Sequence, residues 1–259
     1  MNRKNIIGII PAAGKGTRLA PFPCAKELFP VGYQNFLVNG EYQKRPKVVS
    51  QYLIENIVAA GADKMIVIIG EGKSDIMKYY GSGNNFGADF SYLYQSEQKG
   101  MPFAINLAEN WVQNSTVIFG MPDTIIEPAD AFQKLLEDHQ KNSADLTLGL
   151  FATQTPSKFG MVQLDKENYV VNTIDKPASS DLQYMWGCAC WSPVFTKLIA
   201  DYIQYDDEKK RTKEMVLGEI FNEAISKKLK VKGYCFEGGQ YIDIGTADEL
   251  DQALKKFHL

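Results

Sequence analysis

Hydrophobic and polar positions follow two different spacings over the first half of the chain. Short, nearly continuous apolar runs stand at residues 5–11, 64–70 and 116–120, and such runs are typical of strands buried on both faces of a sheet. Between them, apolar residues recur every three to four positions, as in residues 48–60, which Gly61 follows. This spacing predicts a helix that ends before a glycine. The same spacings predict further strands at 90–95 and 146–151 and further helices at 103–111 and 129–140.

The second part of the chain has a different order of elements. Apolar or alternating segments at residues 160–165, 169–175 and 183–191 follow one another without a long helix between them, which favours antiparallel strands. The remaining segments are helices at 193–203, 213–226 and 247–257, a charged surface loop at 204–211 and a polar excursion at 35–45. The chain therefore predicts an α/β fold of the Rossmann-like, three-layer αβα type, with a mostly parallel central sheet and a mixed, antiparallel half.

Length, composition and charge narrow the class of protein. A chain of 259 residues corresponds to between one and two domains at ~150 residues each, and we expect a single domain, residues 1–259, with a parallel half at 1–150 and a mixed half at 151–259. A hydrophobic content of 45% is that of a globular protein. The net charge of −3 provides no basic excess for nucleic-acid or membrane binding. The N-terminal apolar run is too short for a signal sequence or a membrane span, so we expect a cytoplasmic protein.

Cysteine and histidine usage limits the chemistry that the chain can perform. Cys188 and Cys190 alternate along an apolar run, where small core residues are expected, and no second Cys/His pair completes a zinc site. The chain has only two histidines, which disfavours a Ser-His-Asp or Cys-His mechanism. Strand alternation in the same run predicts Tyr184 and Trp186 on one face and Trp191 on the other.

The strongest local signal is the segment AAGKGTR at residues 12–18, directly after the first predicted strand. Gly14 and Gly16 would let backbone N–H groups close around a phosphate chain, and Arg18 would add a positive charge and a planar donor group. Lys26 follows shortly afterwards. The segment therefore predicts a site for a polyphosphate, although a plain glycine-rich turn would explain the glycines as well.

Two familiar phosphate-binding motifs fit the sequence less well. The dinucleotide fingerprint G-x-G-x-x-G requires a third glycine at position 19, which is Leu19. A Walker loop is nearly complete at residues 72–74 (GKS), but its first glycine would fall at Val67. A dinucleotide-dependent oxidoreductase is therefore disfavoured.

The run from residue 9 to residue 31 resembles the signature loop of the sugar-1-phosphate nucleotidyltransferases, the NDP-sugar pyrophosphorylases. Their pattern consists of G-x-G-T-R, a proline shortly afterwards, and a lysine followed by Pro-Val. In this chain the pattern is residues 14–18, Pro21, Lys26 and residues 30–31. The resemblance continues in register along nearly the whole chain, through Gln95 with Gly100, residues 120–123 ending in Asp123, Gly160, residues 175–177, Gly187, and residues 241–246 around Asp243.

The resemblance implies transfer of a nucleotidyl group from a nucleoside triphosphate to a sugar 1-phosphate, with Mg²⁺ as cofactor, on a GT-A-like nucleotidyltransferase fold. The first half would bind the nucleotide and the second half the sugar phosphate. The implied site residues are Arg18 and Lys26 for catalysis, Ala13, Gly14, Gly16, Thr17, Gln95 and Gly100 for the nucleotide, Gly160, Asp175, Lys176 and Gly187 for the sugar phosphate, and Asp123 and Asp243 for the metal.

General chemistry agrees with this residue set. In-line attack of one phosphate on another needs cations that offset the repulsion between two anions, and it needs no protein nucleophile, which suits a chain with two histidines. Mg²⁺ prefers carboxylate and phosphate oxygens. Asp123 and Asp243 each follow an apolar strand, and a parallel sheet gathers its ligands at the carboxyl ends of its strands.

Several positions depart from the family pattern. Ala25 replaces the proline before the lysine, Asp175 replaces the glutamate of E-K-P, and the polar excursion at residues 35–45 is extra. Some segments are similar to uridylyl-transferring members and others to thymidylyl-transferring members, so we expect UTP or dTTP, with glucose 1-phosphate as acceptor. The alternatives are a nucleotide-sugar-binding regulatory protein with a decayed site and a GT-A glycosyltransferase, although residues 123–125 (DTI) lack the second carboxylate of Asp-x-Asp. The sequence leaves open whether the protein forms a homo-oligomer.

Overall fold

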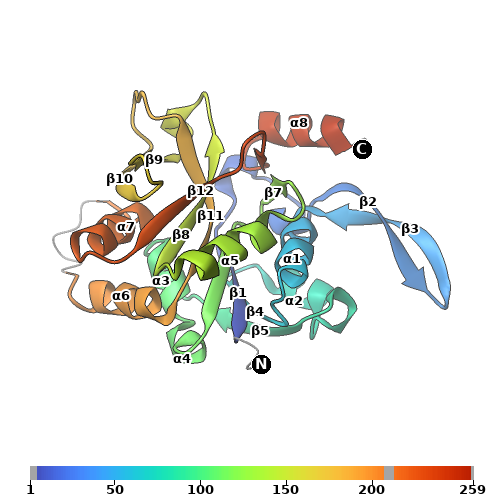
Figure 1. The fold of residues 1–259 in the computed structure, drawn as a ribbon. Coiled ribbons are helices and arrows are strands. Elements are labelled where there is room, and N and C mark those ends of the chain that lie inside the picture. The colour runs from blue at the N-terminus through green and yellow to red at the C-terminus, as the bar shows by residue number, and fades with distance from the viewer. Residues whose placement is uncertain (1–4, 207–212, 258–259) are drawn as a thin grey trace.

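The computed structural model describes residues 5–206 and 213–257. Its centre is a nine-stranded sheet with helices on both faces (Figure 1). The main path of the sheet has the order β10-β9-β11-β6-β1-β4-β5, while β8 pairs with β11 and with β12. The strands are β1 (Ile6–Ala12), β4 (Lys64–Ile69), β5 (Asp89–Tyr94), β6 (Thr116–Gly120), β8 (Leu146–Ala152), β9 (Gly160–Leu164), β10 (Val170–Asp175), β11 (Tyr184–Trp191) and β12 (Val231–Cys235).

The first half of the sheet is parallel, as the apolar runs predict. β1 lies between β4 and β6 and runs parallel to both, with Ile9 opposite Ile66 on one side and Phe119 on the other. All three side chains are buried. β5 adds a fourth parallel strand beside β4. Since the carboxyl ends of parallel strands meet at one edge, the loops after β1, β4, β5 and β6 all open on the same side of the sheet.

The second half of the sheet is mixed, and this prediction is also confirmed. β11 runs antiparallel to β6, β8 and β9, and β10 is antiparallel to β9. Only β12 is parallel to its neighbour β8. The antiparallel direction brings the start of β11, the start of β9 and the end of β10 to the edge where the parallel strands end, because Asp175 pairs with Gly160 and Cys188 with Gly120.

Helices cover both faces of the sheet through two large hydrophobic clusters. One cluster joins α3, α4, α6 and α7 to the sheet, and the other joins α1, α2 and α5 to its opposite face. None of the helices in the described ranges has the length and apolar sequence needed to cross a membrane. The helices are α1 (Val49–Ala59), α2 (Ser74–Tyr80), α3 (Met101–Asn106), α4 (Glu109–Val112), α5 (Ala131–Asn142), α6 (Pro193–Gln204), α7 (Leu217–Ser226) and α8 (Ala247–Phe257).

Two small sheets lie outside the central sheet. β7 (Thr124–Glu127) pairs with β13 (Gln240–Asp243) in an antiparallel ribbon, and α8 packs beside this ribbon in a third, smaller hydrophobic cluster. β2 (Pro30–Val38) and β3 (Glu41–Val48) form a hairpin that extends away from the body of the protein (Figure 1).

Several elements differ from the sequence predictions. The polar excursion is the tip of the β2–β3 hairpin, whose turn is Asn39-Gly40 with both φ angles positive; Asn-Gly is a strong hairpin signal, but the polar residues around it concealed the strands. The helix predicted at 103–111 is divided into α3 and α4, and α7 begins at Leu217 rather than at residue 213. The predicted charged loop at 204–211 lies partly in α6 and, from residue 207 onwards, outside the described residues.

The predicted faces of β11 are wrong at one position. Tyr184, Trp186 and Trp191 all pack in the same hydrophobic cluster, while Cys188 and Cys190 are buried in the cluster on the other face. The register shifts between Trp186 and Cys188, and a bulge of this kind reverses the alternation that follows it. The cysteines are core residues, as the sequence predicts.

Gly187, at this bulge, has no room for a side chain. A Cβ atom added there would lie 2.5 Å from Tyr241 Cδ2 and 3.0 Å from Phe151 Cδ2, both of them atoms of packed rings. We therefore expect Gly187→Ala to lower the free energy of unfolding by about 1–3 kcal/mol, the usual cost of overpacking, in urea denaturation. Gly14→Ala is the matched control, because no atom lies within 4 Å of an added Cβ there. Equal stability of the two variants would contradict this account.

Candidate active site

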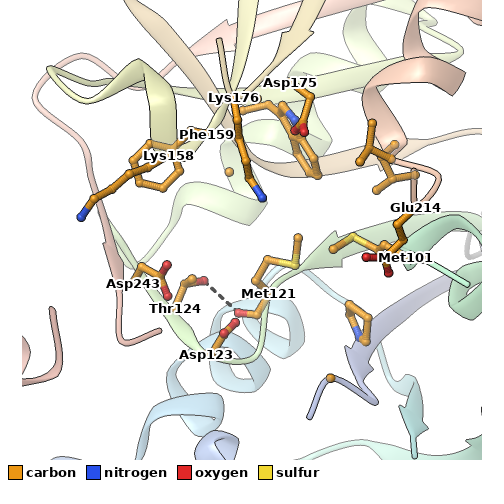
Figure 2. A pocket seen from close by; sticks show the side chains of 18 of the residues that line it. Met101, Met121, Asp123, Thr124, Lys158, Phe159, Asp175, Lys176, Glu214 and Asp243 are labelled. Atoms are coloured by element: carbon orange, nitrogen blue, oxygen red, sulfur yellow. Dashed lines mark hydrogen bonds between the residues drawn. The ribbon is translucent and has the colours of Figure 1, made fainter. Parts of the chain in front are cut away.

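A cavity of about 630 Å³ lies at the edge of the sheet where the parallel strands end. Loops after β1, β5 and β6 form one side of it, and β9, β10 and β11 form the other side. Segments that are far apart in the sequence therefore meet in one space (Figure 2). The sequence-predicted site residues that line the cavity are Ala13, Gly14, Arg18, Lys26, Gln95, Gly100, Asp123, Gly160, Asp175, Lys176, Gly187 and Asp243.

The glycine-rich loop after β1 opens into this cavity at Gly14. The space around Gly14 is empty on the side where a Cβ would stand, so the packing of the fold does not require glycine at this position. Gly16 adopts the left-handed conformation with φ 65° and begins a 3₁₀ turn over Thr17–Leu19. Gly16 and Thr17 are not among the residues that line the cavity; they shape the turn that brings Arg18 to it.

Lys26 reaches the cavity from a second 3₁₀ turn, Lys26–Leu28. Its Nζ forms an ion pair with the carboxylate of Asp123, which follows β6. Burial alone would lower the pKa of Lys26, but the charge of Asp123 and the hydrogen bond to it outweigh burial and raise this pKa above its usual value. Lys26 is therefore a permanent cation beside the carboxylate.

Asp123 and Asp243 lie side by side, because β7 and β13 pair next to them. Asp243 is opposite Thr124 in this ribbon, and the N–H of Ile244 donates to the backbone carbonyl of Asp123 at 3.1 Å. Burial, followed by the negative charges of Asp123 and Glu249, raises the pKa of Asp243 to about 6. No group of three or more His, Cys, Asp and Glu side chains suited to a metal occurs in the part of the chain that the structure describes. Asp123 and Asp243, the metal ligands expected from the sequence, both line the cavity (Figure 2).

Two further cations line the cavity: Arg18, which the sequence predicts, and Lys158, which it does not. A Cβ added at Gly245 would lie 2.7 Å from Arg18 Nη2, so the guanidinium group lies close to the segment that carries Asp243. Lys158 Nζ forms an ion pair with Glu249 Oε1 at 2.8 Å, and both residues line the cavity. The sequence prediction missed this pair, although Lys158 stands two residues before Gly160 of the family pattern.

Lys176 points into the cavity from the side opposite Asp123 (Figure 2). Its φ angle is 41°, in the left-handed region, which is uncommon for a residue with a side chain and costs on the order of 1 kcal/mol. Its N–H donates to the Phe159 carbonyl at 3.0 Å. This backbone conformation lets Asp175 continue the pairing of β10 while the next side chain turns towards the cavity.

The walls near Lys176 are formed by rings and by a carboxylate. Gly160 is covered by Trp186, since a Cβ added at Gly160 would lie 2.3 Å from the indole Nε1. Glu214 and Met101 line the same end of the cavity (Figure 2). The sequence prediction missed both residues. Glu214 was assigned to a helix at 213–226, which in fact starts at Leu217.

Gln95 and Gly100 line the cavity in the segment that follows β5. Gln95 is buried, and its N–H donates to the Ile69 carbonyl at 2.8 Å. Gln98, another residue that the prediction missed, donates from Nε2 to the Ala13 carbonyl at 2.8 Å and so joins this loop to the glycine-rich loop. Gly100 has φ 111° and no space for a Cβ, which would lie 2.4 Å from the Met215 carbonyl.

Comparison with known proteins agrees with the resemblance found in the sequence. A glucose-1-phosphate thymidylyltransferase of Streptomyces antibioticus is 27% identical over 172 residues, which are 65% of this chain and 44% of that protein. A mannose-1-phosphate guanylyltransferase of Mycobacterium tuberculosis is 25% identical over 252 residues, 96% of this chain and 64% of that protein. The chain thus spans less than half the length of some of the curated relatives that it matches.

The fold also has solved counterparts. A UDP-glucose pyrophosphorylase complexed with UDP-glucose superposes with a TM-score of 0.78 at 19% identity, and the match covers 97% of this chain and 98% of that one. This likeness confirms the predicted fold class. The sequence pattern of the Nucleotidyl transferase family matches residues 7–258, almost the whole length. The chain belongs to the nucleotidyl transferase family.

Proposed function

We propose that the protein is an enzyme that transfers a nucleotidyl group from a nucleoside triphosphate to a sugar 1-phosphate and releases pyrophosphate. The observation that carries this proposal is the meeting, in one cavity, of the open glycine loop at Gly14, the cations Arg18, Lys26 and Lys176, and the pair Asp123–Asp243. Similarity to uridylyl- and thymidylyl-transferring members favours UTP or dTTP, with glucose 1-phosphate as the acceptor. The continuous sheet supports one domain for both halves of the chain.

In the proposed reaction, a phosphate oxygen of the sugar 1-phosphate attacks the α-phosphorus of the triphosphate. One P–O bond forms there, the bond to the oxygen that bridges to the β-phosphate breaks, and pyrophosphate leaves with that electron pair. Lys176 stands across the cavity from Asp123, which forms an ion pair with Lys26, so Lys176 and Lys26 would bind the attacking phosphate and the α-phosphate respectively. Arg18 and the N–H groups of the glycine loop would bind the leaving phosphates.

Asp123 and Asp243 fit a divalent cation. Two neighbouring carboxylates share the positive charge of Lys26, and the raised pKa of Asp243 shows that its ionised form is poorly compensated. Carboxylates are the ligands that Mg²⁺ takes from proteins that bind nucleotides. When bound, Mg²⁺ would neutralise charge on the triphosphate oxygens. We therefore infer that these two residues hold Mg²⁺.

The proposed function is tested by pyrophosphate release from purified protein with five nucleoside triphosphates and several sugar 1-phosphates, in Mg²⁺ and in EDTA. We expect Mg²⁺-dependent release with UTP or dTTP and glucose 1-phosphate. Asp123→Ala, shown to be folded by circular dichroism, should reduce this rate by roughly 10²-fold or more, as loss of charge stabilisation at a reacting phosphate does. No release with any pair from folded protein would favour a nucleotide-sugar-binding protein with a decayed site.

Replacement of Asp243 should change the stability of the protein in a pH-dependent way. The pKa of Asp243 is about 6 in the folded protein and near 3.8 in the unfolded chain. The free energy of unfolding is therefore highest below pH 4, and it decreases as the pH rises from 4 through 6. Asp243→Asn removes this loss. In EDTA at pH 7.5 we expect the variant to be more stable by on the order of 1–3 kcal/mol, and at pH 4 to equal the wild type.

Thermal unfolding at the two pH values measures this effect. Mg²⁺ with nucleoside triphosphate should raise the Tm of the wild type but not that of Asp243→Asn, since a ligand stabilises only the state that binds it. A wild type that is more stable than the variant in EDTA at pH 7.5 would refute the assignment.

Replacement of Lys176 should weaken binding of the sugar phosphate and leave the fold intact. Lys176→Gly removes the cation and relieves the positive φ of 41°, so we expect the KM for the sugar phosphate to rise by roughly 10-fold or more, on the scale of a lost charged hydrogen bond. The KM for the triphosphate should change little and the Tm should not fall. Equal changes in the two KM values would contradict the assignment of Lys176 to the sugar phosphate.

A further inference from the structure

The segment after β4, residues 70–75, packs behind both loops that carry the phosphate-binding groups. Gly70 lies against the glycine-rich loop, because a Cβ added at Gly70 would stand 2.9 Å from the Ala13 carbonyl oxygen. Lys73 and Asp75 reach the second loop, which carries Lys26. This segment includes the GKS sequence at residues 72–74, which is an incomplete Walker loop.

Lys73 is held in a buried ion pair next to Lys26. Its Nζ lies 2.6 Å from Glu27 Oε2, and the exposed fractions of Lys73 and Glu27 are 5% and 1%. The backbone carbonyl of Glu27 also accepts a hydrogen bond from Ser50 Oγ at 2.6 Å. The residue that follows Lys26 is therefore fixed through both its side chain and its backbone.

The residue that precedes Lys26 is fixed from the same segment. The N–H of Ala25 donates to Asp75 Oδ2 at 2.6 Å, and Ala25 is buried. Lys73 and Asp75 thus hold the two neighbours of Lys26, while the side chain of Lys26 reaches Asp123 and Glu27 also lines the cavity. Neither Lys73 nor Asp75 lines the cavity.

Burial of an ion pair is a poor way to stabilise a fold. Removing two charges from water costs several kcal/mol per ion, and replacement of a buried pair by apolar residues of similar volume is often neutral or stabilising. A role in positioning explains the pair better, since a displacement of a reacting group by ~1 Å can reduce a rate by about 10²-fold.

We propose that Lys73, through Glu27, and Asp75, through the N–H of Ala25, are positioning residues that fix the 3₁₀ turn Lys26–Leu28 so that Lys26 Nζ meets the α-phosphate. Neither residue contacts the substrate. Lys73, the lysine of the GKS sequence, thus affects the phosphates only through Lys26. This inference depends on the proposed function, because it assigns the effect to Lys26.

The main test replaces the ion pair by two methionines, Lys73→Met with Glu27→Met. We expect kcat to fall by about 10- to 10²-fold, on the scale of a misplaced reacting group, with both KM values within roughly 3-fold of the wild type and with Tm unchanged or higher. Lys47→Met with Glu55→Met is the control, since it removes a more exposed ion pair whose residues do not line the cavity. This control should retain the wild-type kcat.

A double-mutant cycle distinguishes positioning from general stability. In a Lys26→Ala background, the two methionine substitutions should change kcat by less than about 2-fold, because residues that act through one group are not additive. A further loss in that background as large as in the wild type would overturn the proposal.

Asp75 provides a second test that does not depend on the methionine variant being folded. Asp75→Asn keeps one side-chain oxygen, which can accept from the N–H of Ala25, and loses the other, which accepts from the N–H of Ile76. It should retain kcat within about 3-fold, whereas Asp75→Ala should lose roughly 10-fold, the scale of a lost hydrogen bond to a charged group. Equal rates for the two variants, or wild-type kcat in the methionine variant, would overturn the inference. Absence of pyrophosphate release by the wild type would instead count against the proposed function.

Discussion

The site depends on one electrostatic constraint, the proximity of two carboxylates that repel each other. Pairing of β7 with β13 places Asp243 beside Asp123, and burial, followed by the negative charge of Asp123, raises the pKa of Asp243. Lys26 offsets part of this repulsion through its ion pair with Asp123. The ribbon and the turn that carries Lys26 together bring these three charges into one place, where each carboxylate is more costly to ionise than in water unless a cation lies beside it.

Space matters as much as charge. Gly187 of β11 lies against Tyr241 of β13, so the strand that carries Asp243 can pack here only if β11 has a glycine at this position. Gly160 lies in the same way against Trp186. Gly14 is different, because nothing in the protein occupies the space beside it. Two of these glycines are therefore explained by packing, whereas packing within the protein does not explain the third.

The sequence predicted the parts that depend on local pattern. Parallel strands were visible because burial on both faces gives continuous apolar runs. Most residues of the family motifs line the cavity, because they follow those strands or lie on the antiparallel strands that reach the same edge. What was missed depends on contacts over long distances. Lys158 pairs with Glu249 and Lys73 with Glu27 only after folding, the bulge at Gly187 reversed the faces of β11, and the polar hairpin concealed its Asn-Gly turn.

The pairing of β7 with β13 also has a consequence for synthesis of the chain. Its two strands are separated by more than a hundred residues, so a loop that contains most of the second half must close before Asp123 meets Asp243, and closures of this kind are slow. Strand β1 and the glycine-rich loop leave the ribosome long before. A nascent chain would thus contain its glycine-rich loop early but could not form the pair of Asp123 and Asp243 until residue 243 had been translated.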